Sequence, residues 1–494
     1  MWCGRVAVSF LLSGLASAAW INNISNRDLC VNTPLRVRGC GRPHLFELEL
    51  PEEPASPWTF KPQCINSTFG SPQLCVFTSH EFANGRGISI ITTPSTAAAI
   101  QNLTSFTQSG NLTKAGEMAV PPFEVRDLPG RGKGGIANTT LHRGDRLLAA
   151  TPAILVDMRV NRFLNVMDGI MLETIAVRQL PPQANEMFWE LHNQPTTNSV
   201  RDRITVNAFA VEVAGWQFSG VVLETSVGSV RQIDRRCKLP SHCGANPRSQ
   251  RFNHDCRPNS AYYFDEKTLT HYTHASTEIN PGTEISLTYI SPLAPQQHRQ
   301  NTLRVSWGFK CTCSQCSMHP KMIKHSDTRI EHINNMTRLL YGWHERWTAR
   351  LDLTDAAAVA AADTKKPVVK DEQQAKKHEE AQQKAMDKIP VISNVEAIAT
   401  AETVISLYQQ ERLVVYSSDA HLIAALANCA EGRRTEAIKH AQLALETGLV
   451  HEGLDDELHV DVVKLGVDPT KEPCWLKKEA GSSLSDVGEV AESS

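Results

Sequence analysis

The 494-residue sequence lacks two features that would indicate a membrane or a nucleic acid as partner. After the N-terminal segment it has no run of about 18 apolar residues, so we expect no membrane span. Its net charge is only -3, from 50 Lys and Arg against 53 Asp and Glu. Nucleic-acid binding usually needs a strong positive field, and this chain has none, so we expect no direct nucleic-acid contact.

One short apolar run does occur, at the N-terminus. Arg5 precedes an apolar stretch, Val6–Leu15, which ends in Ala-Ser-Ala-Ala. This order predicts a signal peptide over residues 1–19, cut after Ala18 or Ala19, and therefore a secreted protein or one of the secretory pathway. The alternative is a short buried helix, in which case the protein belongs to the nucleus or cytoplasm.

Six Asn-x-Ser/Thr sequences offer glycan sites in that compartment. Five of them lie before residue 140, where polar and turn-forming residues are frequent. A chain of this length contains a few by chance, so they support the leader only weakly. They are Asn23, Asn66, Asn102, Asn111, Asn138 and Asn335.

Thirteen cysteines are many for a cytosolic protein, and they fall into groups. In a secreted chain the four after the leader predict two disulfides in one of three pairings. Without a leader they are simply four thiols. These four are Cys30, Cys40, Cys64 and Cys75. Of the others, Cys237 and Cys243 lie close together, and Cys429 and Cys474 are isolated.

The length predicts two or three domains. Residues 20–117 alternate short apolar runs with Pro, Gly, Asn and Ser, which predicts a Cys-containing, disulfide-linked accessory region. Residues 353–390 are rich in Ala, Lys, Glu and Gln and predict a charged linker. Residues 391–494 are expected to be helical. Small residues at helical spacing there resemble tetratricopeptide-like helix pairs, and a plain helical cap is the alternative.

Three motifs follow one another within residues 251–316. Arg-Phe-Asn253-His254-Asp-Cys256 comes first, Gly-Thr-Glu-Ile-Ser-Leu-Thr-Tyr289 second, and Cys-Thr-Cys-Ser-Gln-Cys316 third. Their order resembles the SET domain of protein-lysine methyltransferases, with the closest fit to fungal proteins in which the domain is split. The resemblance covers residues 120–317.

The resemblance implies an α+β fold, with the irregular β-structure of SET domains interrupted by a helical insert. The implied bounds are a SET domain at 118–290 with a helical insert at 157–203, a zinc-binding post-SET segment at 291–320 and a helical connector at 321–352. The sequence also predicts strands at residues 204–209 and 218–223.

The resemblance also implies the roles of individual residues. Tyr289 corresponds to the catalytic tyrosine, and Trp307 and Tyr289 to the wall of the substrate channel. The implied S-adenosylmethionine contacts are Gly132, Lys133, Gly134, Asn207, Asn253, His254 and Phe309. Glycines in such a loop let the backbone approach a ligand closely.

The last motif supplies three thiolates, whereas a closed tetrahedral zinc site needs four ligands. The family resemblance implies Cys256 as the fourth, beside Cys311, Cys313 and Cys316. The alternative, in an oxidising compartment, is that these cysteines form disulfides.

Two features depart from the family pattern. Residues 157–205 contain no cysteine, so the zinc module that some relatives carry inside the split domain is missing. An extra segment, residues 228–248, also precedes the Asn-His motif. It carries several Arg and Lys, so we expect it to loop out into solvent, with Phe252 resuming the strand path left near Leu223. A retained intron is the alternative.

Together these features predict S-adenosylmethionine-dependent methyl transfer to a lysine of a protein substrate. The reaction needs a neutral amine and an aligned, dry approach. Two alternatives remain: a catalytically inactive SET scaffold that binds protein partners, for which the C-terminal helices are the candidate surface, and a secreted disulfide-stabilised protein.

Overall fold

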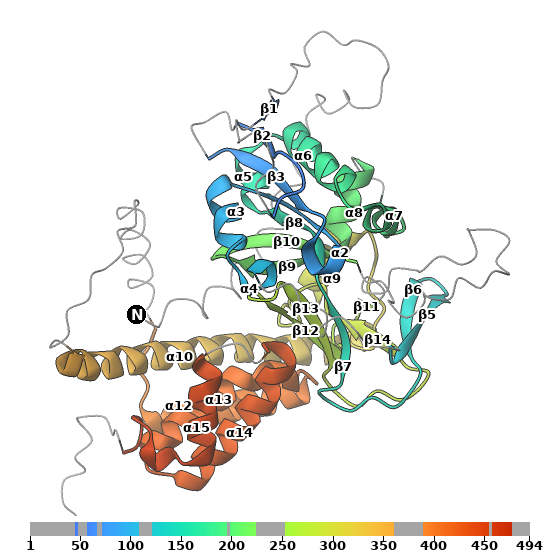
Figure 1. Cartoon of the computed structure of the whole chain (residues 1–494). Coiled ribbons are helices and arrows are strands. Elements are labelled where there is room, and N and C mark those ends of the chain that lie inside the picture. The colour runs from blue at the N-terminus through green and yellow to red at the C-terminus, as the bar shows by residue number, and fades with distance from the viewer. Residues whose placement is uncertain are drawn as a thin grey trace, which may run out of the picture. The chain divides into compact units, whose positions relative to one another are not determined.

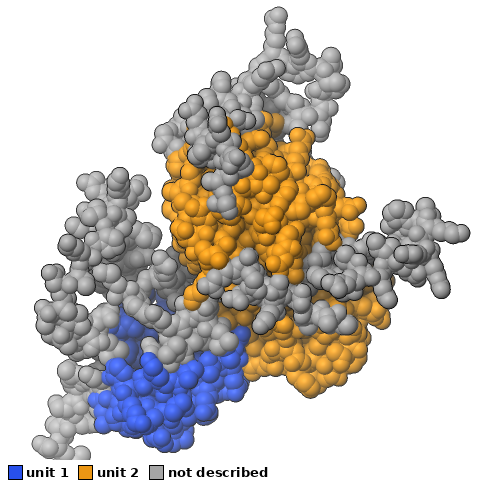
Figure 2. Space-filling model, viewed as in Figure 1, with its two compact units in different colours: residues 1–9, 320–449, 454–494 blue, residues 10–319, 450–453 orange. Residues whose placement is uncertain are grey.

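The computed structural model describes residues 45–47, 57–66, 72–107, 121–194, 198–223, 252–359, 389–453 and 457–476. Figure 2 distinguishes two compact units: residues 10–319 with 450–453, and residues 1–9, 320–449 and 454–494. The expected leader, the extra loop at 228–248 with Cys237 and Cys243, and most of the charged linker lie outside the described residues.

The larger unit combines strands with helices (Figure 1). Its strands are β1 (Leu45–Glu47), β2 (Gln63–Ile65), β3 (Leu74–Ser79), β4 (Ile88–Thr92), β5 (Phe123–Leu128), β6 (Gly132–Ala137), β7 (Arg146–Ala150), β8 (Pro152–Asp157), β9 (Ala208–Val213), β10 (Trp216–Val222), β11 (Asn253–His254), β12 (Ser260–Asp265), β13 (Thr270–Ala275) and β14 (Glu284–Leu287). Its helices are α2 (Phe82–Gly85), α3 (Pro94–Ile100), α4 (Thr104–Thr107), α5 (Arg159–Phe163), α6 (Val166–Arg178), α7 (Pro182–Trp189), α8 (Ser199–Asn207) and α9 (Gln296–Trp307).

The largest sheet joins two parts of the chain that the sequence suggested were separate. Its strand order is β1-β2-β3-β4-β8-β10-β9, and β4 pairs in parallel with β8, with Ile90 opposite Leu155. The region expected as an accessory region therefore supplies strands to the same sheet as residues 152–222. The disulfide Cys64–Cys75 links neighbouring strands β2 and β3 of that sheet, while Cys30 and Cys40 lie outside the described residues.

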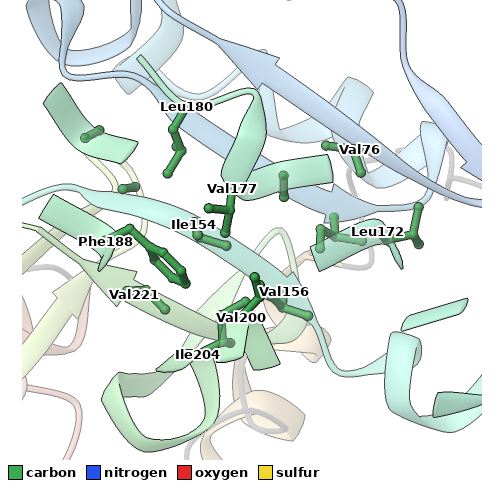
Figure 3. Close-up of a cluster of buried hydrophobic side chains, with 14 of the residues drawn as sticks. Val76, Ile154, Val156, Leu172, Val177, Leu180, Phe188, Val200, Ile204 and Val221 are labelled. Atoms are coloured by element: carbon green, nitrogen blue, oxygen red, sulfur yellow. The ribbon is translucent and has the colours of Figure 1, made fainter. Parts of the chain in front are cut away.

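Strand β8 is buried on both faces, which explains its unbroken apolar sequence. Successive side chains point to opposite faces of a strand. Ile154 and Val156 pack with Leu172 and Val177 of helix α6 in one cluster (Figure 3), whereas Leu155 belongs to a second cluster on the other face. Helix α6 contacts β2, β3, β4 and β8, so it covers one face of the sheet.

Two smaller sheets have the strand orders β11-β14-β6-β5 and β12-β13-β7, and the first of them carries residues of the first two motifs in β11 and β14. Strand β11 pairs in parallel with β14, with Asn253 opposite Ser286 and His254 opposite Leu287. The expectation that Phe252 resumes the path left near Leu223 is wrong, because β10 pairs with β8 and β9 in the large sheet. Phe252 instead packs on Phe123, with 4.9 Å between ring centroids.

The strand expected at residues 204–209 begins only at Ala208. Residues 199–207 form helix α8, which the Asn198 side chain caps by accepting from the backbone N–H groups of Val200 and Arg201. Val200 and Ile204 are both buried in the cluster under α6. Burial at positions i and i+4 favours the helix over the β-propensity of Ile and Val.

The smaller unit is helical in its described residues. Its elements are α10 (Pro320–Val359), α12 (Asn394–Gln410), the 3₁₀-helix η6 (Val414–Ser417), α13 (Ser418–Ala430), α14 (Arg434–His451), α15 (Glu457–Val467) and the 3₁₀-helix η7 (Pro469–Lys471). Helix α12 contacts α10 and α13, and its Ala397 and Ala401 are fully buried. Cys429 and Cys474 are not isolated, since they form a disulfide across this unit. Among the described helices, none combines the length and apolar character needed to cross a membrane.

Candidate cofactor and metal site

Asn253 meets the glycine loop at the end of strand β6, where β6 has only one neighbouring strand. Strand β5 pairs with β6 along residues 132–137, but β14 pairs only with Gly135 and Ile136. Beyond Gly135, the described partner on that edge is a side chain, because Asn253 Nδ2 donates to the Lys133 carbonyl at 3.2 Å. A Cβ at Gly134 would lie 2.3 Å from Leu128 Cδ1, 3.0 Å from Glu284 Oε1 and 3.1 Å from Asn253 Nδ2, so a larger residue there would displace these side chains. This edge therefore leaves main-chain groups available to a ligand.

Asn253 is held by a charged pair. Its Nδ2 also donates to Glu284 Oε1 at 2.8 Å, and Glu284 Oε2 lies 3.3 Å from Arg131 Nε in an ion pair. Both hydrogens of the Asn253 amide are thus used within the protein. Its Oδ1 remains as an acceptor for a ligand.

His254 connects the strand edge to the cysteines. Its ring is 3% exposed; Nδ1 accepts from the Tyr289 backbone N–H at 3.1 Å, and Nε2 lies 3.3 Å from Cys256 Sγ. Because Nδ1 is the acceptor, the neutral ring carries its proton on Nε2 and donates it to the sulfur. Burial lowers the His254 pKa to about 4, so the ring is neutral at pH 7.

Tyr289 lies among aromatic rings at the end of the second motif. Its hydroxyl donates to the Phe252 carbonyl at 2.9 Å, and its ring centroid is 5.5 Å from those of His254 and Trp307. The ring centroid of Phe309 lies 6.2 Å from that of His254. Burial raises the pKa of the Tyr289 phenol above its ordinary value, so it stays protonated at neutral pH.

The segment that includes helix α8 contacts the aromatic residues around Tyr289. Trp307 Nε1 donates to the Val206 carbonyl at 3.1 Å. Gln194 packs closely on Gly308, because a Cβ at Gly308 would lie only 2.6 Å from Gln194 Nε2. Asn207, beside Val206, donates to the carbonyls of His192 at 2.8 Å and Arg203 at 2.7 Å. Both amide hydrogens of Asn207 therefore brace the insert itself, and its predicted cofactor contact stays a prediction.

The four predicted metal ligands converge although about 55 residues separate the first from the other three. The sulfurs of Cys256, Cys311, Cys313 and Cys316 all lie within 4.8 Å of one another, and Cys256 and Cys316 are 3.5 Å apart. Four sulfurs at about 2.3 Å from a tetrahedral zinc are roughly 3.8 Å apart. None of the four is in a disulfide, unlike the Cys64–Cys75 and Cys429–Cys474 pairs. The cluster thus has the dimensions of a four-thiolate zinc site.

Helix α9 positions the last three cysteines. Gln300 donates to the Cys311 carbonyl at 2.7 Å and accepts from the Cys311 N–H at 3.0 Å. Leu303, one turn later, packs with Cys256, Cys311 and Cys313 in one buried cluster. The helix ends at Gly308 in the left-handed conformation, which turns the chain toward the cysteines.

Three residues around the site were not predicted from the sequence. Glu284 stood inside a recognised motif but had no role assigned, and Arg131 stood in the turn before Gly132. Arg299 gave no signal at all, because a polar helix of low hydropathy such as residues 296–307 does not reveal which arginine is buried.

Comparison with known proteins bears on the same residues. Residues 132–290 match the family model described as the SET domain. The chain contains a SET domain. The expected α+β SET-type fold is therefore confirmed, with helices and sheets mixed as the sequence predicted.

Curated relatives are fungal. The chain is 32% identical over 229 residues to "Histone-lysine N-methyltransferase set5" of Schizosaccharomyces pombe, which covers 46% of this chain and 59% of that protein. It is 41% identical over 64 residues to "Histone-lysine N-methyltransferase SET5" of Saccharomyces cerevisiae, or 13% of this chain and 12% of that protein. The match thus spans less than two thirds of either relative.

A solved structure described as the SET domain of LSMT bound to lysine and AdoHcy also matches. It is 10% identical, with 76% of this chain and 91% of that chain covered, at a TM-score of 0.24.

Proposed function

We propose that this protein transfers a methyl group from S-adenosylmethionine to a lysine side chain of a protein substrate. The observation that carries the proposal is the meeting of the Gly132–Gly134 edge, Asn253, His254 and Tyr289 within one SET domain. The names of the fungal relatives favour a histone lysine as substrate.

The strand edge and the asparagine fit a polar ligand. Main-chain groups of residues 132–134 and Oδ1 of Asn253 would bind polar parts of the cofactor, and Phe309 would cover an apolar part. Bound S-adenosylmethionine supplies a methyl group on a positively charged sulfur. Asn253 is already oriented by Glu284 and Lys133, so ligand binding costs little additional side-chain entropy.

Tyr289 and Trp307 would act on the substrate lysine. An apolar surrounding disfavours the ammonium form, which lowers the lysine pKa toward the neutral amine that the reaction needs. The protonated phenol of Tyr289 stands fixed by its hydrogen bond to Phe252, and Trp307 is fixed by Val206. These side chains would align the amine and exclude water, which is where most of the rate gain of such a displacement arises.

The four cysteines would hold zinc in a closed, structural role. Cys256 follows the Asn-His motif, and the other three follow Trp307 and Phe309. A metal shared by these segments would fix the two aromatic residues against the cofactor edge. The metal takes no part in the transfer itself.

The proposal is tested by titration with S-adenosylmethionine in a calorimeter and by transfer of labelled methyl groups to purified histones. Tyr289→Phe should lower turnover roughly tenfold or more, while cofactor affinity changes by less than about threefold, or about 0.7 kcal/mol. The matched control is Tyr262→Phe, a partly buried tyrosine of strand β12, which should leave both values unchanged.

Two outcomes contradict the proposal in different ways. A parent protein that binds no S-adenosylmethionine would favour the inactive scaffold. A parent that binds and transfers, with Tyr289→Phe equally fast, would show that the reaction occurs without this tyrosine.

A further inference from the structure

Phe252 contacts the proposed catalytic tyrosine with its backbone and the neighbouring sheet with its ring. Its carbonyl accepts a hydrogen bond from the Tyr289 hydroxyl at 2.9 Å. Its ring packs edge-on against Phe123 of strand β5, with 4.9 Å between the ring centroids. The side chain is 2% exposed. Ring and carbonyl share one Cα, so the packing of the ring helps to fix the carbonyl that holds the phenol.

Gly135 of strand β6 lies against this ring. A Cβ there would come within 2.8 Å of Phe252 Cε1 and 2.9 Å of Phe252 Cδ1. Carbon atoms pack best at about 3.5–4.0 Å, so either contact would be a clash. The same Cβ would lie 3.3 Å from Phe123 Cδ2. A buried ring beside Phe123 cannot swing aside as a flexible chain end can. A side chain at residue 135 would therefore push the Phe252 ring out of its present position.

The backbone of Gly135 gives no other reason for a glycine. Its φ lies outside the left-handed region, and it pairs with Val125 on one side and Ile285 on the other as an ordinary strand residue does. A glycine inside a strand weakens the strand and often marks the close approach of another group. The close group here is the Phe252 ring. The position thus depends on the absence of a side chain and not on backbone freedom.

The residue after Phe252 is held by contacts of its own. Asn253 pairs with strand β14, and its side chain donates to Glu284 and to the Lys133 carbonyl. A shift of the Phe252 ring is therefore resisted at Asn253 and acts mainly on the Phe252 carbonyl and the Tyr289 hydroxyl. Hydrogen bonds weaken steeply when their angle departs from linear, so a small shift is enough to release the phenol.

We propose that Gly135 is a positioning residue for Tyr289, which acts through the ring and the carbonyl of Phe252. Because Gly135 has no side chain, the ring packs where its own carbonyl fixes the direction of the phenol hydroxyl. The proposed cofactor contacts are those of residues 132–134, so the role of Gly135 is separate from theirs. The inference rests on the role proposed for Tyr289 in methyl transfer.

The test compares single and paired variants of the full-length protein. Gly135→Ala should lower kcat for methyl transfer to purified histones about tenfold, while the dissociation constant of S-adenosylmethionine changes by less than about threefold. In Phe252→Leu the ring is absent, and the shorter side chain can rotate away from residue 135. Adding Gly135→Ala to Phe252→Leu should therefore lower kcat by less than about threefold, because substitutions that act through one contact are not additive.

Gly220→Ala is the matched control, because it makes the same change inside strand β10 of the large sheet. A Cβ there would lie 3.3 Å from Leu155 Cδ2, which is the end of a flexible side chain. This variant should keep the parental kcat and dissociation constant. Circular dichroism and the melting temperature show whether each variant is folded. If Gly135→Ala alone does not fold, the double variant is compared with Phe252→Leu, and the same small difference in kcat is expected.

A second readout does not depend on activity. The chain has seven tyrosines, and labelling them with 3-fluorotyrosine gives fluorine resonances among which Tyr289 is identified by its loss in Tyr289→Phe. Because the fluorine is adjacent to the hydroxyl, its resonance reports the hydrogen bond to Phe252. The resonance should shift in Gly135→Ala and keep its parental position in Gly220→Ala.

The role of Gly135 is overturned by an unmoved Tyr289 resonance or an unchanged kcat in Gly135→Ala. An equally large loss of kcat with and without Phe252→Leu overturns it too, as does a double variant that fails to fold. A parent that binds no S-adenosylmethionine contradicts the proposed function instead, and the fluorine resonance still tests the contact in that case. The two failures are distinguishable, because only the second is seen in the unmutated chain.

Discussion

Glu284 connects three segments of the site through one carboxylate. It accepts from Asn253, pairs with Arg131 and stands 3.0 Å from where a Cβ of Gly134 would lie. Arg131 also donates to the His254 carbonyl at 3.3 Å. The side chain thus orients the residues of both the glycine edge and the Asn-His motif without having to touch the cofactor.

We expect Glu284→Gln to weaken S-adenosylmethionine binding about tenfold, or about 1.4 kcal/mol. A glutamine keeps the shape but loses the charge that holds Arg131, and hydrogen bonds to charged groups are the stronger ones. Calorimetric titration measures the change. Glu278→Gln, an exposed glutamate just before β14, is the control. An unchanged dissociation constant in Glu284→Gln would show that Asn253 is oriented by Lys133 alone.

At the scale of elements, strand β13 places a histidine where it cannot be charged. His271 is fully buried, with its ring 4.3 Å from Phe209 and 4.9 Å from Tyr262, and its Nε2 lies 3.2 Å from the Thr273 hydroxyl. Burial lowers its pKa to about 3. The stack joins β13 and β12 to β9 of the large sheet.

This histidine should make the protein sensitive to acid. In the unfolded chain its pKa is about 6.5, so below that pH the unfolded state binds a proton that the folded state does not. The free energy of unfolding therefore falls as the pH drops from about 6.5 toward 3, with about 2 kcal/mol lost by pH 5. His271→Phe keeps the stack and removes this loss.

Urea unfolding at pH 7 and pH 5 measures this fall in the free energy of unfolding. The difference between the two pH values should be smaller in His271→Phe than in the parent. His298→Gln, which changes an exposed histidine on α9, should behave as the parent does. A parental pH dependence in His271→Phe would mean that His271 is protonated in the folded state.

At the scale of the whole molecule, the disulfide Cys429–Cys474 links two distant segments of the smaller unit. The disulfide spans a sequence separation of 45 and joins the end of α13 to the segment after η7. A cross-link over a loop of this length stabilises a domain by roughly 3–4 kcal/mol, mainly by restricting the unfolded chain.

Replacing both cysteines by alanine should lower the free energy of unfolding of the smaller unit by that amount, which is measured as a lower urea midpoint. A reductant should lower the midpoint of the parent similarly and leave the double variant nearly unchanged. Equal midpoints for parent and double variant without reductant would show that the bond contributes no stability in solution.

The compartment is a second property of the whole molecule. The apolar leader predicts entry into the secretory pathway and a mature protein that starts at Ala19 or Trp20, whereas methyl transfer to histones requires the nucleus, the compartment expected if the leader is false. In the described residues Asn66, Asn102, Asn138 and Asn335 are exposed. Protein from the native host should therefore lose mass on glycosidase treatment. N-terminal sequencing that begins at Met1, with no mass change, would place the protein inside the cell.

The SET domain and its candidate residues could be predicted from the sequence because each motif is local. Asn253, His254 and Cys256 are near neighbours in the chain, as are Cys311, Cys313 and Cys316, so covalent spacing alone keeps each group together. Their chemical types then indicate what each group can bind. The helical insert that the resemblance implied at 157–203 does contain helices α5, α6 and α7.

Only the tertiary structure decided which distant segments of the chain contact one another. The parallel pairing of β4 with β8 joins the N-terminal strands to the SET sheet, and the pairing of β11 with β14 overturns the expected strand path at Phe252. Cys429 meets Cys474, and Arg299 is buried, for the same reason. Periodicity shows that a face is apolar, but it does not name the partner, because that choice depends on how all the elements pack together at once.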